Sequence, residues 1–130
     1  VSLIPSPYTR WGRRTVYEQL PANYPNRQAA LEYKRVYEAK YGAGSITAFG
    51  ANTWDATLLV RAAAAKSLDQ GLQPGTKEFR EAVRDNLERT AELNGCLGVA
   101  SFNAERHWPY KGDGPVMVMV EHGVWHLLPK

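Results

Sequence analysis

The sequence predicts an α/β chain in which three helices are followed by a short strand and a C-terminal β-hairpin. Apolar residues recur at helical spacing through residues 26–93, whereas short β-rich runs bounded by Gly and Pro make up residues 94–130. Residues 1–25 contain four prolines, which predict an extended connection with one short strand at residues 1–4 rather than a helix. The expected units are therefore a linker, a helical part and a strand-rich part.

The second predicted helix is the most informative stretch of the chain. The first helix follows Asn26, a typical N-cap residue, and stops at Gly42, where a C-cap is expected. The second runs from near Phe49 to near Gly71, and its apolar residues span more than the stripe of about 100° that a surface helix turns toward a core. Such a helix needs packing partners on several faces. These apolar residues are Leu58, Leu59, Val60, Ala62, Ala63, Ala64, Ala65 and Leu68.

A third helix is expected to begin after Thr76, which is a suitable N-cap. Phe79, Val83 and Leu87 lie four residues apart on one of its faces. This spacing predicts an amphipathic helix with one apolar side.

The pattern changes from helix to strand at Asn94 and Gly95. Residues 98–102 are typical of a short strand, and residues 116–120 and 124–128 of a hairpin. Glu121, His122 and Gly123 are expected to form its tight turn.

Composition and charge exclude several classes of protein. The chain has 16 Lys and Arg against 13 Asp and Glu, a net charge of +3, and no basic stripe interleaved with aromatics, so nucleic acid is not an expected partner. The single cysteine, Cys96, excludes an internal disulfide and a multi-cysteine zinc site. No apolar run reaches the roughly 18 residues of a membrane span, and no signal-like segment follows Val1.

No group of residues in the sequence indicates catalysis, a metal site or a cofactor. His122 and His126 are four apart, but they bracket a predicted hairpin turn rather than share a helix face. Cys96 lacks the local base and orienting group that nucleophilic catalysis needs. Gly42 and Gly44 lack the rest of a phosphate-binding loop. We therefore expect no enzyme, no bound metal and no cofactor.

The residues at the start of the second helix form the candidate binding site. They combine an aromatic ring (Phe49), two small residues (Gly50 and Ala51) and an amide (Asn52). A helix N-terminus offers free N–H groups and a partial positive charge, which suit a carboxylate ligand. An equally suitable interpretation makes Phe49 and Trp54 core aromatics and Asn52 a polar residue of the first turn.

Five segments of the chain follow one another in an order and with gaps that are typical of one family. They are Glu18-Gln19-Leu20-Pro21, Tyr37-Glu38-Ala39-Lys40-Tyr41-Gly42, Phe49-Gly50-Ala51-Asn52-Thr53-Trp54-Asp55-Ala56, Pro74-Gly75-Thr76-Lys77-Glu78-Phe79-Arg80 and Asn94-Gly95. Together they resemble the C-terminal third of a type I periplasmic substrate-binding protein, in the branched-chain amino acid class of ABC transporter receptors. The similarity covers most of the chain from about Glu18 onward.

The resemblance implies a two-lobed α/β receptor in which each lobe is a parallel sheet flanked by helices. Residues 1–25 would form a crossover, residues 26–93 would belong to the N-terminal lobe, and residues 94–130 would return to the C-terminal lobe. Phe49 matches a position that lines the cleft between the lobes, and the residues through Asn52 match the adjacent wall. The implied function is non-catalytic capture of a small carboxylate in the periplasm, for an ABC importer whose membrane permease is the partner.

The resemblance also implies a ligand class and an incomplete protein. The Phe-Gly-Ala-x-x-Trp-Asp-Ala form is similar to members that take aromatic carboxylates rather than leucine or valine. The family is several times longer, so we expect ligand binding only with the rest of the receptor. We expect the isolated chain to bury residues 49–68 in a homodimer or higher oligomer, since large exposed apolar patches drive association. A ligand-sensing domain of a signalling receptor is the alternative, followed by an enzyme or an independent interaction domain.

Overall fold

The computed structural model describes residues 16–110, 117–122 and 124–128 and has helices followed by short strands, as predicted. The helices are the 3-10 helix η1 (Tyr17–Gln19) and the α-helices α2 (Arg27–Tyr41), α3 (Ala48–Asp69) and α4 (Lys77–Glu88). The strands are β1 (Leu93–Asn94), β2 (Val99–Ala100), β3 (Val118–Glu121) and β4 (Val124–Leu127). In the part of the chain that is described, no helix combines the length and apolarity needed to cross a bilayer.

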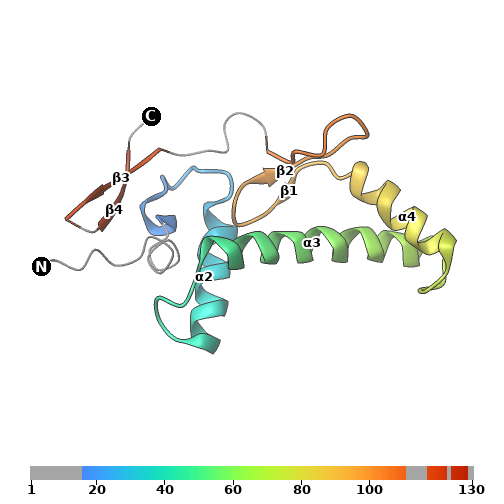
Figure 1. The fold of residues 1–130 in the computed structure, drawn as a ribbon, viewed down its shortest axis with the longest axis horizontal. Coiled ribbons are helices and arrows are strands. Elements are labelled where there is room, and N and C mark those ends of the chain that lie inside the picture. Colours follow the sequence, from blue (N-terminus) through green and yellow to red (C-terminus); the bar gives the residue numbers. More distant parts are fainter. Residues whose placement is uncertain (1–15, 111–116, 123, 129–130) are drawn as a thin grey trace, which may run out of the picture.

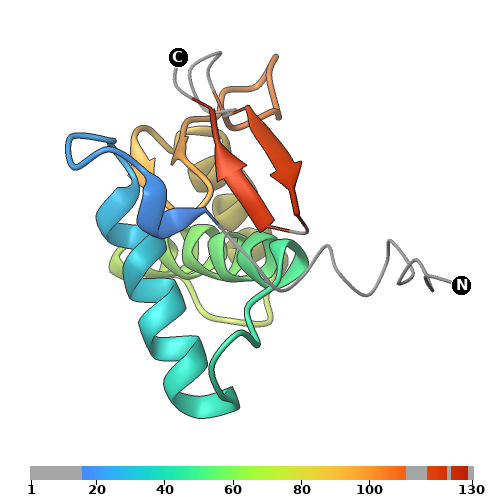
Figure 2. The same ribbon diagram turned by 90° about the vertical axis from the view of Figure 1, so that its left-hand side faces the viewer.

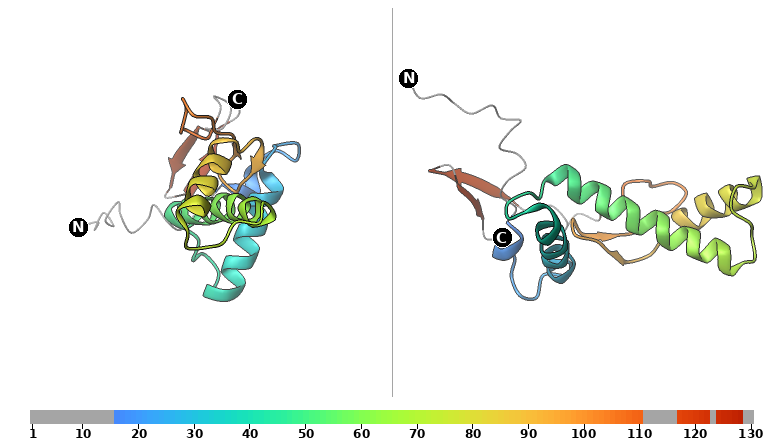
Figure 3. Two further views of the ribbon diagram at one scale, coloured as in Figure 1. Left: turned by 90° about the vertical axis from the view of Figure 1, so that its right-hand side faces the viewer. Right: turned by 90° about the horizontal axis from the view of Figure 1, so that it is seen from below.

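The long helix α3 is the axis of the molecule (Figure 1). α2 crosses one end of α3, and α4 turns back along the other end after a short connection. The β1–β2 pair lies over α3, and the β3–β4 hairpin lies beyond α2, near η1 (Figures 1 and 2). The views from the side and from below show the same elongated order from the hairpin to α4 (Figure 3).

Side-chain caps and a glycine set the helix ends. Thr47 Oγ1 accepts a hydrogen bond from Gly50 N at 2.9 Å at the start of α3. Thr76 Oγ1 accepts one from Phe79 N at 3.2 Å, as predicted for the start of α4. α2 ends at Gly42, whose φ of 92° lies in the left-handed region that glycine favours.

Two expectations about the segment before α2 are corrected. Asn26 occupies the N-cap position, but its side chain makes no capping bond; its Nδ2 donates to Cys96 O at 2.9 Å instead. The connection was expected to be extended, yet η1 is a single 3-10 turn, because Tyr17 and Leu20, three residues apart, both enter the core. The strand expected at residues 1–4 lies outside the described residues.

Both small sheets consist of two antiparallel strands. β1 pairs with β2 so that Leu93 lies opposite Ala100, and β3 pairs with β4 so that Val118 lies opposite Leu127. The predicted hairpin is therefore confirmed. The strand expected at residues 98–102 is shorter, and Glu121, expected in the hairpin turn, is the last residue of β3.

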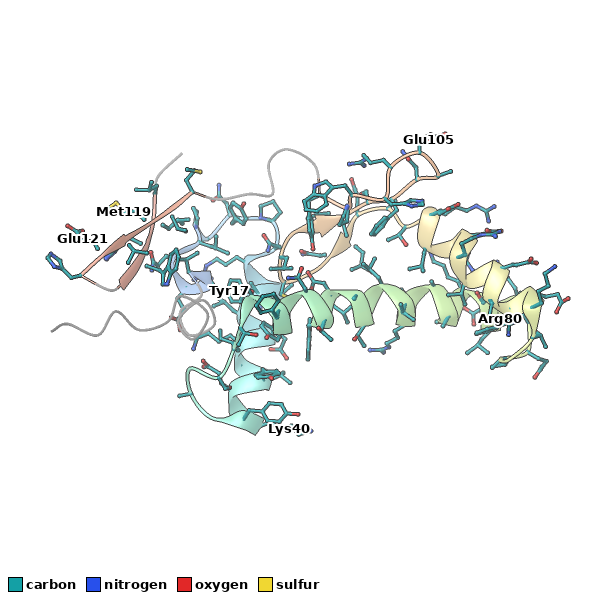
Figure 4. All side chains as sticks on the ribbon, in the orientation of Figure 1. Tyr17, Lys40, Arg80, Glu105, Met119 and Glu121 are labelled. Carbon is teal, nitrogen blue, oxygen red and sulfur yellow. The ribbon has the colours of Figure 1, made fainter. Side chains whose placement is uncertain are left out.

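The apolar core lies where α2 crosses α3. Tyr33 is at its centre, and small residues such as Ala30 and Ala51 let the two helices approach closely. Figure 4 shows Tyr17 entering this crossing from η1. The buried members of the cluster are Tyr17, Leu20, Ala30, Tyr33, Ile46, Ala51 and Cys96.

A buried carboxylate joins α3 to the turn between β1 and β2. Asp55 accepts hydrogen bonds from Cys96 N at 2.7 Å and from Leu97 N at 2.9 Å, and Tyr110 Oη lies 3.5 Å from Asp55 Oδ2. The turn passes so close that a Cβ at Gly95 would lie 2.5 Å from Asp55 Oδ2. Since a buried carboxylate is costly without hydrogen bonds, Asp55 holds the turn against α3.

The described residues cover one face of α3 well and leave others open. Ala51, Asp55, Ala63 and Ser67 are its buried residues, spaced by multiples of four. Elsewhere on the helix Val60 remains 51% exposed, and Leu68, nearer the C-terminus, is exposed to the same extent. The helix that the sequence predicted to need several partners therefore has too few of them among the described residues.

Candidate functional site

The predicted site lies at the start of α3, where the loop after α2 leads into the helix. Glu38 on α2 holds this loop, because its carboxylate accepts the N–H of Gly44 at 2.8 Å and contacts Lys34 Nζ at 2.6 Å. Lys34 lowers the pKa of Glu38, and Glu38 in turn raises the pKa of Lys34, so the pair is charged at neutral pH. Ile46, which is fully buried, anchors the end of the loop.

Gly50 makes the close approach of α2 and α3 possible. A Cβ at this position would lie 2.5 Å from Tyr33 Oη. Tyr33 is itself fully buried, and its hydroxyl donates weakly to Thr47 O at 3.5 Å. Burial raises the pKa of Tyr33, so the phenol stays protonated. This close approach explains why glycine occupies the position, although alanine has the higher helix propensity.

The structure separates the four predicted site residues into two pairs. Phe49 is 79% exposed, and Asn52 also faces solvent, with its Nδ2 donating to Ala48 O at 2.9 Å. Gly50 and Ala51 face inward; Ala51 is fully buried, and its carbonyl lies 3.5 Å from Cys96 Sγ. The interpretation of Phe49 as a core aromatic is wrong for this chain.

Trp54, the other aromatic residue of that interpretation, does pack against the core. Its ring packs against Tyr33 with centroids 5.4 Å apart, and Tyr33 also contacts the rings of Tyr17 and Tyr37. The spacing of Tyr33 and Tyr37, four apart on α2, is the sequence signal that would have indicated this aromatic side.

The start of α3 also presents backbone donors. The amides of Gly50 and Ala51 are bonded to Thr47, through its Oγ1 and its carbonyl oxygen respectively. The amides of Ala48 and Phe49 have no partner among the described residues. With the partial positive charge of a helix N-terminus, these donors suit an anionic group.

Within the described part of the chain, open grooves flank α3 on the sides of α2 and α4. One of about 490 Å³ lies between α2 and α3, with aromatic walls and one guanidinium, Arg61. The other, of about 330 Å³, lies between α3 and α4 and is almost wholly apolar. The first is lined by Tyr33, Tyr37, Gly50, Thr53, Trp54, Thr57, Leu58 and Arg61, and the second by Ala56, Leu59, Val60, Arg84, Leu87, Glu88, Phe102 and His107.

The residues considered for chemistry in the sequence lie apart from one another. Cys96 is buried, and burial raises the pKa of its thiol, so it is not a thiolate at neutral pH. His107 contacts Glu88, the last residue of α4, at 3.3 Å, whereas His122 and His126 belong to the hairpin. Across the described ranges, no three His, Cys, Asp or Glu side chains gather closely enough to hold a metal ion.

Solved structures, but no family model and no curated protein sequence, match the chain. It resembles a protein of Rhodopseudomonas palustris strain CGA009 with a TM-score of 0.78 and 27% identity, over 87% of this chain and 31% of the other. An extracellular ligand-binding receptor from strain HaA2 gives a TM-score of 0.78 and 26% identity over the same shares. A further HaA2 receptor structure of that description gives 0.76 and 29%, over 90% of this chain and 32% of the other.

The chain has the fold of one part of an extracellular ligand-binding receptor. The arrangement predicted from the sequence, three helices with a short strand and a hairpin, is thereby confirmed, and it matches part of that receptor fold. The chain spans about a third of the length of these proteins. The division of the chain between two lobes, and the role of Phe49 to Asn52, stay predictions.

Gly50→Ala is predicted to destabilise the chain by about 1–3 kcal/mol, because the added Cβ overlaps Tyr33 Oη. In a Tyr33→Phe background that oxygen is absent, so alanine should instead stabilise the helix by up to about 1 kcal/mol. Urea unfolding followed by far-UV circular dichroism measures both changes. An equal loss in the two backgrounds would show that the hydroxyl contact is not the reason for glycine.

Proposed function

We propose that this chain is part of the solute-binding component of an ABC importer, which captures a small carboxylate between two lobes without catalysing a reaction. The observation that carries the proposal is the similarity to extracellular ligand-binding receptors, at 26–29% identity over 87–90% of the chain. In the proposal, residues 26–93 belong to the N-terminal lobe, residues 94–130 lead into the C-terminal lobe, and residues 1–25 form a crossover. The receptor works in the periplasm and delivers its ligand to a membrane permease.

The proposed ligand contacts are at the start of α3. Phe49 offers a large ring that is exposed in this chain and would stack on the apolar part of a ligand. Asn52 supplies an amide, and Gly50 and Ala51 form the wall behind them. The amides of Ala48 and Phe49, which are unpaired among the described residues, favour the carboxylate through the helix dipole.

The proposed ligand is a branched-chain amino acid or an aromatic carboxylate. Both have an anionic end for the helix N-terminus and an apolar end for Phe49. An aromatic ligand gains an offset or edge-to-face ring contact of about 0.5–1.5 kcal/mol in addition to burial of its surface. Leucine, valine and benzoate are therefore suitable test compounds.

Phe49→Ala is predicted to weaken binding by about tenfold or more, because burying a Phe side chain contributes about 1.5–3 kcal/mol. The measurement is calorimetric titration with these three compounds. The protein is this chain fused to the portion of the HaA2 receptor that lies outside its match, so that both lobes are complete.

Trp108→Ala is the matched control, since Trp108 is another exposed aromatic residue but lies in the loop after β2. Equal losses in the two variants would place the ligand site elsewhere. A fused receptor that folds but binds none of the three carboxylates would contradict the proposed function.

We also propose that the isolated chain forms a homodimer through the exposed apolar side chains of α3, chiefly Phe49, Val60 and Leu68. A native mass spectrum at micromolar concentration should show twice the mass of one chain. A Val60→Glu, Leu68→Glu double variant should return a monomer, whereas Lys66→Glu, at an exposed polar position on another face of the same helix, should not. A monomeric unaltered chain would contradict this proposal.

A further inference from the structure

The β3–β4 hairpin has the character of a piece of a larger sheet. Residues 116–120 read Val-Met-Val-Met-Val, a continuous apolar run typical of a strand buried on both faces. In a strand with one solvent-exposed face, apolar and polar residues alternate instead. Yet Met117 is 73% exposed, Met119 41% and Val120 55%. Figure 4 shows Met119 and Glu121 on the hairpin, away from the three α-helices. Because an isolated hairpin of two strands is only marginally stable in water, we expect this apolar run to pack against a further element.

The register of the hairpin determines which backbone groups β3 leaves free. Leu128 N donates to Met117 O at 2.9 Å. In an antiparallel pair, residues whose N–H and C=O groups point toward the partner strand alternate with residues whose groups point away from it. The backbone groups of Met117 and Met119 therefore point toward β4. The N–H and C=O groups of Val118 and Val120 therefore point away from β4. These groups have no partner among the described residues.

The opposite edge of the hairpin is capped by one side chain. Gln19 Nε2 donates to Trp125 O at 3.0 Å, and Leu127 N donates to Gln19 Oε1 at 2.8 Å. The amide of Gln19 thus takes both positions that a peptide group of a neighbouring strand would take. β3 has no such cap among the described residues, and it contains neither the Lys nor the Pro with which proteins block an exposed edge.

We propose that the outer edge of β3 pairs with a β-strand supplied by the part of the receptor that lies outside this chain. The chain spans 31–32% of the receptors it resembles, so more than two thirds of a receptor is available to supply that strand. Met117 and Met119 lie on the face opposite Leu127, which packs on the core, and a larger sheet with its covering layer would bury them as well. A second copy of the hairpin would extend the edge without covering this face. The open edge is an observation of this chain, whereas the identity of its occupant rests on the proposed function.

Amide hydrogen exchange followed by NMR tests the proposal. The isotopically labelled chain is measured alone and mixed with the portion of the HaA2 receptor that lies outside the match, with leucine and benzoate binding recorded on the same mixture. The amides of Val118 and Val120 should exchange freely in the chain alone and at least tenfold more slowly in the mixture. The receptor's own matched segment, added to the same portion, is the positive control.

Val120→Pro is the matching variant. It removes one outward N–H but none of the hydrogen bonds to β4, since proline is tolerated where the N–H faces away from the ladder. It should lose at least tenfold in affinity for the receptor portion, whereas Val120→Thr, which keeps the N–H and the shape, should bind as the unaltered chain does.

The outcomes separate the strand pairing from the proposed function. A mixture that binds a carboxylate without slowing Val118 and Val120 would overturn the pairing and leave the function standing. Equal affinity of the Pro and Thr variants, or no association where the control segment associates, would overturn the pairing too. Slow exchange in the chain alone that increases with concentration would assign the edge to a second copy and overturn the proposed occupant. Slowed amides in a mixture that binds neither carboxylate would support the pairing and count against the function.

Discussion

The carboxylate of Asp55 is the interaction on which the packing of the strands against the helices depends. Its two oxygens accept the N–H of Cys96, which is buried, and the N–H of Leu97, which is partly buried. Without the carboxylate both donors would be unpaired, at about 1–3 kcal/mol for the buried one. The turn is held from a second direction, because Asn26 donates to the carbonyl oxygen of Cys96. Cys96 Sγ also lies against Ala51 O. α2, α3 and the β1–β2 turn therefore meet at one buried cysteine.

This meeting point also positions the start of α3. Ala51 packs on Cys96, and the hydroxyl of Tyr33 lies close to Gly50, one residue earlier. The inner side of the first turn of α3 is therefore packed against both Cys96 and Tyr33. Phe49 and Asn52, on either side of this pair, are turned outward as a consequence of helical geometry. The same contacts that stabilise this end of α3 thus expose the residues proposed to contact a ligand.

Much of the helical fold could be predicted because its signals are local. Thr76 and Gly42 mark helix ends, and the apolar residues all around α3 correctly indicated a helix with too few partners. The role of Asp55 could not be predicted, because its partners lie 41 and 42 residues away and no spacing rule joins them. Asn26 was mistaken for a capping side chain for the same reason, since its partner is 70 residues distant. The exposure of Phe49 could not be predicted either, because the spacing of apolar residues does not show which of them lack a packing partner.

Hydrogen exchange at the two amides that Asp55 accepts tests this account most directly. The amides of Cys96 and Leu97 should exchange among the slowest outside the helices, and Asp55→Asn should accelerate both together by about tenfold or more. Asp69→Asn, at the exposed end of the same helix, should leave both rates unchanged. If the two amides of the unaltered chain exchanged as fast as those of the exposed connection between α3 and α4, the carboxylate would not be holding the turn, and the account would be wrong.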